Sequence, residues 1–187
     1  MAKNIYHRYL NIPFDPQIDL FNRENYDTEQ YAHIRLKEEE INPKLVKWFE
    51  QFNIEIHWYE AFYTPPNGGK LPIHTDSDDD GEHIKINWTY GAPGSKLIWW
   101  EPKSKDYIQI VKTAFGVQYC TIDEAHSTKV YEAEINKPSL VNASQFHSTF
   151  NPTTEGRWTC SMPLSDLKTG IKVTWDDAMK RFEGIII

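Results

Sequence analysis

The chain has 187 residues, which suits one domain with a substantial core and is short for two. Aromatic residues make up 14% of the sequence, which favours a β-rich body, while a net charge of −7 with dispersed Lys and Arg disfavours binding to a large nucleic acid. Two isolated cysteines and the lack of a long apolar run argue against a disulfide framework, a membrane span or a secretion signal, so we expect a soluble, cytoplasmic protein.

The N-terminal part, about residues 1–53, is expected to start with a short extended segment and then to be helical, including a polar, acid-rich stretch around 28–40. Asn42 and Pro43 are typical of an N-cap and a first helical position. The apolar residues that follow, up to Phe52, recur at helical spacing. We expect this helix to pack its apolar stripe on a sheet.

From residue 54 the hydrophobic period changes to two, and clusters of Pro, Gly and Asn interrupt the sequence at short intervals. The expected strands cover about 54–63, 70–76, 83–90, 96–101, 107–112, 116–122, 128–133, 138–142, 145–150 and 157–162. Many short strands between turn signals favour a sandwich or barrel. Thr174 and Asp177 then form a capping pattern for a short helix at about 174–183. We expect a single domain whose β core spans about 54–163.

Four polar residues form one chemical pattern. His74 and Asp76 are two residues apart in an extended segment, so both side chains point to the same face. His147, in another expected strand, can add a third ligand, and two histidines with one carboxylate suit non-haem Fe(II). Ten residues later, Arg157 offers a planar guanidinium that can pair bidentately with a carboxylate. The pattern predicts a metal site beside an anchor for a dicarboxylate co-substrate.

The run His74-x-Asp76, then His147, then Arg157-x-Thr159 resembles the Fe(II)/2-oxoglutarate-dependent dioxygenases. Segments 86–90 and 97–102 look like strands of small family members carried by tailed phages that infect cyanobacteria. The resemblance covers roughly residues 54 to 163 and implies a mainly β fold, the double-stranded β-helix (jelly-roll, cupin-like), with flanking helices. A phage-encoded member would act in the host cytoplasm.

The resemblance also implies an activity. Fe(II) would be held by His74, Asp76 and His147, and the distal carboxylate of 2-oxoglutarate by Arg157 with Thr159. With O₂, such an enzyme hydroxylates a C–H bond and decarboxylates 2-oxoglutarate to succinate. The carboxylate at position 76 favours hydroxylation over halogenation. The substrate class stays open between a small molecule and a peptide, and the oligomeric state is not readable.

Further residues have candidate roles in the same site. In many family members a tyrosine near the first barrel strand assists the arginine, and Tyr59 and Tyr63 share a strand face, with Tyr63 taken as the 2-oxoglutarate contact. Asn87 is a second polar candidate. His83 is expected on a solvent-exposed strand face. Core positions are expected for the tryptophans of the strands, which are Trp88, Trp99, Trp100 and Trp158.

Two alternatives compete with this interpretation. The acidic run 76–82 matches the first half of a calcium-binding EF-hand loop, but Asn87 stands at the twelfth position, where that loop needs Glu. We therefore interpret the run as a loop at the mouth of the pocket. The second alternative is a non-catalytic or differently catalytic cupin-like metal-binding barrel, which formation of succinate would distinguish from the oxygenase.

Overall fold

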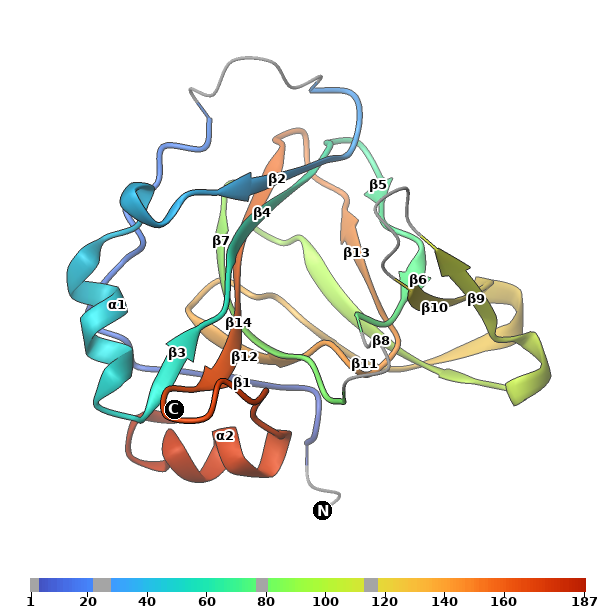
Figure 1. Ribbon diagram of the computed structural model, residues 1–187. Helices are drawn as coiled ribbons and strands as arrows, with labels where there is room; N and C mark the ends of the chain where they lie inside the picture. The colour runs from blue at the N-terminus through green and yellow to red at the C-terminus, as the bar shows by residue number, and fades with distance from the viewer. Residues whose placement is uncertain (1–3, 22–27, 77–80, 113–117) are drawn as a thin grey trace.

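The computed structural model describes residues 4–21, 28–76, 81–112 and 118–187 (Figure 1). Within these ranges the strands form two antiparallel sheets. The first sheet contains β1 (His7–Tyr9), β2 (Ala32–Leu36), β3 (Ile54–Ile56), β4 (Tyr59–Thr64), β7 (Ile84–Tyr90), β12 (Ser139–Asn142) and β14 (Arg157–Asp166). The second contains β5 (Gly69–Lys70), β6 (Ile73–His74), β8 (Lys96–Pro102), β9 (Gln109–Lys112), β10 (Gln118–Ile122), β11 (Ser127–Ala133) and β13 (His147–Asn151).

The order of these strands identifies the fold. From β4 onward the chain crosses between the sheets, and the central strands lie in the order β12-β7-β14-β4 in one sheet and β11-β8-β13-β6 in the other. Two four-stranded antiparallel sheets connected in this way form a jelly roll, so the expected double-stranded β-helix is confirmed. Strands β9 and β10 form a hairpin inserted between β8 and β11, and they extend the second sheet beyond β6 (Figure 1).

Two helices cover the outer face of the first sheet (Figure 1). Helix α1 (Pro43–Glu50) begins as expected, since the Asn42 side chain accepts a hydrogen bond from the backbone N–H of Lys44. Helix α2 (Trp175–Arg181) is capped by Thr174, which accepts from the N–H of Asp177. Four single-turn 3₁₀ segments complete the described part: η1 (Glu38–Glu40), η2 (Lys105–Tyr107), η3 (Glu124–His126) and η4 (Glu183–Ile185). None of the helices described is long and apolar enough to cross a lipid bilayer.

The larger core lies between the first sheet and these helices. Phe49 of α1 packs edge-on against Trp88 of β7 and against Phe182, which follows α2. Trp158 and Cys160 of β14 belong to the same buried cluster. Because side chains alternate along a strand, the residues between them on β7 and β14 face the interior of the barrel. This alternation decides which residues reach the site.

Three local expectations are wrong. Residues 28–40 contain strand β2 and a single 3₁₀ turn, η1, and not the expected helix: Ala32, Ile34 and Leu36 alternate with polar residues and pair with β4 in the first sheet. The strand expected over 54–63 is divided into β3 and β4. Asp76 lies just beyond β6, so its side chain is not held by a strand.

Candidate metal centre

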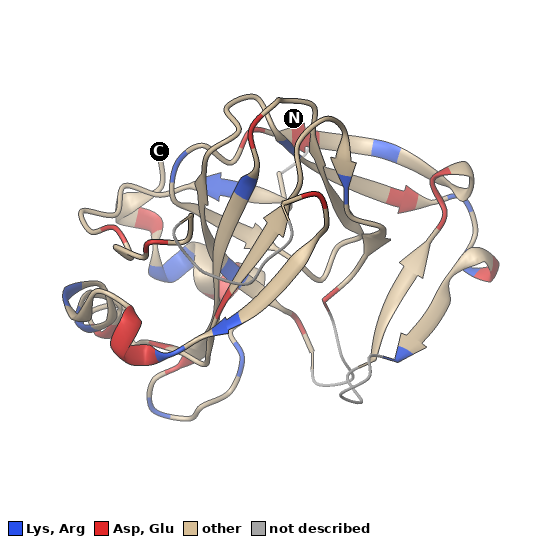
Figure 2. Cartoon of the chain, turned by 90° about the horizontal axis from the view of Figure 1, so that it is seen from above, with Lys and Arg blue, Asp and Glu red and all other residues tan. Residues whose placement is uncertain are grey.

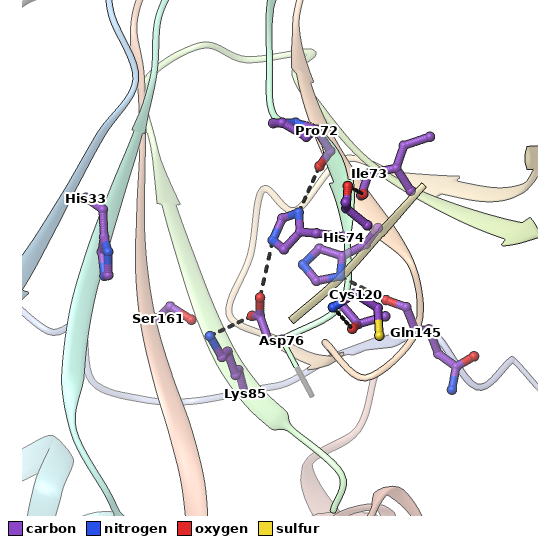
Figure 3. Close-up of polar contacts among 12 residues, drawn as sticks. His33, Pro72, Ile73, His74, Asp76, Lys85, Cys120, Gln145 and Ser161 are labelled. Carbon is purple, nitrogen blue, oxygen red and sulfur yellow. Dashed lines mark hydrogen bonds and ion pairs between the residues drawn. The ribbon is translucent and has the colours of Figure 1, made fainter. Parts of the chain in front are cut away.

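The two sequence-distant histidines of the predicted triad are brought together by the second sheet. His147 begins β13 and is paired directly with His74 of β6, and their ring centroids are 4.6 Å apart. Asp76 follows two residues later, where its backbone N–H donates to the Ala143 carbonyl at 2.8 Å. One ligand atom from each of the three side chains lies within 4.8 Å of the others. The cluster is therefore compact enough for one metal ion, and Figure 3 shows two of its members, His74 and Asp76.

Both imidazoles are oriented by the backbone. His74 Nδ1 donates to the Pro72 carbonyl at 2.8 Å, and His147 Nδ1 donates to the Gln145 carbonyl at 2.9 Å. These bonds place the proton on Nδ1 and leave Nε2 as the available ligand atom of each ring. Metal-binding histidines commonly donate their second ring N–H in this way. The donor set and its orientation thus fit a divalent metal such as Fe(II).

The charges of the cluster follow from burial and from each other. Burial raises the pKa of Asp76, but Lys85 and then His74 outweigh it, so the pKa lies well below its ordinary value. Burial and then the neighbouring His74 lower the pKa of His147 to about 4. For His74, burial lowers the pKa, but the hydrogen bond and charge of Asp76 raise it overall. At neutral pH Asp76 is a carboxylate and His147 a neutral imidazole, the forms that bind metal.

The triad opens on a cavity of about 50 Å³ inside the barrel. Its wall also contains Asn87, Arg157 and Thr159, so six of the seven predicted site residues meet around one space. The register explains the meeting, because Thr159 of β14 pairs with Thr89 of β7, and both face inward. Asn87 is held in place by Ser161, whose hydroxyl donates to Asn87 Oδ1 at 2.8 Å.

Arg157 is the least compensated charge in this cavity. The residue is only 2% exposed, and its Nη2 donates to the Thr89 hydroxyl at 3.3 Å. Its Nε has no hydrogen-bond partner, and no carboxylate in the described ranges forms an ion pair with the guanidinium. Burial lowers the pKa of Arg157 to about 10, which leaves the group charged at neutral pH. The Thr159 hydroxyl beside it is also buried without a partner.

The seventh predicted residue, Tyr63, does not line the cavity. Its ring packs 5.2 Å from that of Trp158, and its hydroxyl donates to the Thr28 carbonyl at 3.1 Å. Tyr59 lies in the same core cluster. On β4 the inward-facing residues are the alternate ones, Phe62 among them, so neither tyrosine is directed at the cavity. The position of Tyr63 does not agree with the predicted contact to 2-oxoglutarate.

Two functional candidates were not predicted from the sequence. These are Lys85 and Glu60. Lys85 Nζ lies 2.7 Å from Asp76 Oδ2 (Figure 3) and 2.7 Å from Glu60 Oε1. Glu60 Oε2 in turn lies 3.2 Å from His33 Nε2. Lys85 precedes Asn87 by two residues and therefore shares its inward face, which was the available signal.

The remaining polar expectations have mixed outcomes. His83 was expected to be exposed but is only 5% exposed, and its Nε2 lies 2.7 Å from Lys172 Nζ. Trp88, Trp99 and Trp158 are buried as expected, whereas Trp100 is only partly buried. Residues 77–80 of the acidic run lie outside the described residues. Among the residues that the structure describes, Lys and Arg are spread over many elements (Figure 2).

No protein-family model matches this chain, and no curated protein matches its sequence. Among solved structures the chain is similar to oxalate oxidase in complex with the substrate analogue glycolate, with 11% identity, coverage of 92% of this chain and 77% of that one, and a TM-score of 0.37. It is also similar to EvdO2 from Micromonospora carbonacea var. aurantiaca, with 14% identity over 73% of this chain and 67% of that one, and a TM-score of 0.44. These low identities and TM-scores describe only a distant structural similarity. By its own strand order the chain is a jelly roll, with a His-Asp-His cluster that can hold a metal ion.

Proposed function

We propose that this protein is an Fe(II)- and 2-oxoglutarate-dependent oxygenase that hydroxylates a C–H bond of a small-molecule or peptidyl substrate. The observation that carries the proposal is the buried, unpaired Arg157 in the same cavity as the His74, Asp76 and His147 cluster. A metal cluster alone fits many barrels. A metal cluster facing an uncompensated guanidinium fits a ligand that is at once a metal chelator and an anion.

The guanidinium requires an anionic partner for a physical reason. Burying an unpaired charge is costly, and the cost is repaid when a carboxylate enters and pairs with it. Arg157 presents a planar fork suited to two parallel hydrogen bonds with a carboxylate, and the free Thr159 hydroxyl can donate one more. A dicarboxylate would place one end on this pair and direct the other end toward the triad.

The chain's residues prepare the cavity for such a reaction. The three ligand atoms lie within 4.8 Å of one another, and Leu97 and Val141 contribute apolar wall. Fe(II) with 2-oxoglutarate, when bound, supplies O₂-dependent oxidation of a C–H bond coupled to decarboxylation to succinate. The protein's contribution is to hold both groups in a fixed relation and to limit the access of water.

The test begins with metal-free protein under anaerobic conditions. Addition of Fe(II) and 2-oxoglutarate should produce the visible charge-transfer band of the chelate. The band should be absent in His147→Ala. After admission of O₂, succinate should form in the wild type. Failure to produce the band in protein that binds Fe(II) would contradict the proposal. A band without succinate would instead indicate the non-catalytic metal-binding barrel.

A further inference from the structure

A chain of charged residues, Asp76, Lys85, Glu60 and His33, extends from the candidate metal site, and the proposed function does not require it. Lys85 is the second residue of β7 in the first sheet and is only 5% exposed. Asp76 follows β6 of the second sheet. The 2.7 Å contact between them therefore joins the two sheets across the barrel interior, next to the ligand atoms.

The two oxygens of Asp76 have different partners. Oδ1 lies 3.2 Å from His74 Nε2, the available ligand atom of that ring. Oδ2 lies 2.7 Å from Lys85 Nζ. A carboxylate can bind a metal through one oxygen or through two. Because Oδ2 is engaged by an ammonium group, Oδ1 is the oxygen left for a metal ion.

Asp76 needs a constraint of this kind because of its place in the chain. It lies outside the strands, where its backbone N–H donates to the Ala143 carbonyl. Lys85 is itself held at the other end by Glu60, at 2.7 Å, and Glu60 contacts the half-exposed His33 at 3.2 Å. The ammonium position is thus fixed by two carboxylates at once.

We propose that Lys85 is a positioning residue of the metal centre, which holds Asp76 so that it binds the metal through Oδ1 alone, and that Glu60 holds Lys85 in that position. The proposal rests on the metal site of the proposed function but not on 2-oxoglutarate. The competing account is that the network only ties the two sheets together, in which case the metal site would not sense its removal once the fold is retained.

The experiment uses metal alone, Co(II) and Mn(II), added to metal-free wild type and variants. Lys85→Met by itself strands Glu60 in the interior and can prevent folding. The decisive protein is therefore Lys85→Met/Glu60→Gln, which removes one positive and one negative charge and leaves the net charge near the metal unchanged. Lys129→Met, in an exposed pair with Glu132 at 2.9 Å, is the matched control. Circular dichroism establishes that each variant is folded.

The expected result is a loss of about 10- to 100-fold in Co(II) and Mn(II) affinity in the double variant, the usual effect of removing a partner of a metal ligand. Its Co(II) absorption spectrum should also change, since a released carboxylate can add its second oxygen to the metal. Lys85→Arg should recover part of the affinity, and Lys129→Met should match the wild type. Unchanged affinity and an unchanged Co(II) spectrum in the folded double variant would overturn the proposal.

The outcome also separates this inference from the proposed function. Wild-type protein that binds Co(II) and Mn(II), together with an unaffected double variant, overturns the role of Lys85 and leaves the oxygenase proposal standing. Wild-type protein that binds neither metal overturns both.

Discussion

Lys85 and Arg157 are two buried cations on neighbouring strands, β7 and β14, and both contribute to the wall of the same cavity. Their surroundings differ. The Lys85 ammonium lies 2.7 Å from each of two carboxylates, whereas the Arg157 guanidinium has one hydroxyl contact, at 3.3 Å, and a buried Nε without a partner.

The difference separates structure from recognition. A buried cation that already forms ion pairs with two carboxylates of the chain has little attraction left for an anionic ligand. A buried cation without an ion-pair partner lowers the stability of the fold, and such a destabilising group is retained where a ligand compensates its charge. This contrast is the basis of our two proposals, that Lys85 supports the metal site and that Arg157 binds an anion.

The largest effect on stability is expected when the compensated cation is removed. Lys85→Ala leaves the buried Glu60 and the partly buried Asp76 without their ammonium partner, so the free energy of unfolding of the metal-free protein should fall by about 3–5 kcal/mol. Chemical denaturation measures this. Lys129→Ala, which breaks an exposed pair, should change it by less than about 1 kcal/mol. Equal effects of the two substitutions would remove the distinction drawn for Lys85.

A pH series sharpens the same point through Glu60. Burial raises its pKa, but Lys85 and His33 outweigh this and lower it to about 2, below the ordinary value of about 4.3. A carboxyl with a depressed folded-state pKa stabilises the protein above its unfolded pKa and loses that contribution as the pH falls through the folded one. Between about pH 4.3 and 2, the wild type should lose more stability than Glu60→Gln. Parallel profiles would show that Glu60 is not held by Lys85.

Removal of Arg157, the cation without an ion-pair partner, should not lower the free energy of unfolding. Arg157→Met takes away a buried charge without stranding a carboxylate, so the free energy of unfolding without ligand should stay the same or rise by about 0.5–2 kcal/mol. Thermal and chemical unfolding of metal-free protein measure it. A loss as large as that expected for Lys85→Ala would mean that Arg157 has a structural partner after all.

The smallest effects concern the neighbours of Arg157. Thr159→Val should weaken 2-oxoglutarate binding by roughly twofold to tenfold, which corresponds to one lost hydrogen bond. Tyr63→Phe should leave that affinity unchanged, because Tyr63 lies in the core and contacts the Thr28 carbonyl. Titrations of the two metal-loaded variants can be compared directly. A larger loss in Tyr63→Phe than in Thr159→Val would reverse the placement of these side chains.

Local patterns in the sequence were sufficient for much of the fold. The caps at Asn42 and Thr174 and the change of period at residue 54 depend only on near neighbours, and the structure contains the helices and strands that they predict. Strand β2 was mistaken for a helix, because its short alternating pattern becomes a strand only when β4 supplies the hydrogen bonds.

The candidate site divides in the same way. The spacing of His74, Asp76 and Arg157 indicates a metal and anion site from the sequence alone, without knowledge of the fold. The face that a strand turns inward is set by its partners, so the sequence could show that Tyr59 and Tyr63 share a face but not that this face is the core. Glu60 and Lys85 are 25 residues apart, and their ion pair depends on the register of whole strands.

The most direct test of the central claim is a titration of metal-loaded protein with 2-oxoglutarate, comparing the wild type with Arg157→Ala and Arg157→Lys. Loss of a buried charge partner costs about 2–5 kcal/mol, so Arg157→Ala should weaken binding by roughly 30-fold to several thousandfold while metal affinity is retained. Arg157→Lys should recover part of the loss, since it restores the charge without the bidentate fork. Equal affinity for 2-oxoglutarate in the wild type and Arg157→Ala would show that the anion anchor lies elsewhere and would contradict the account.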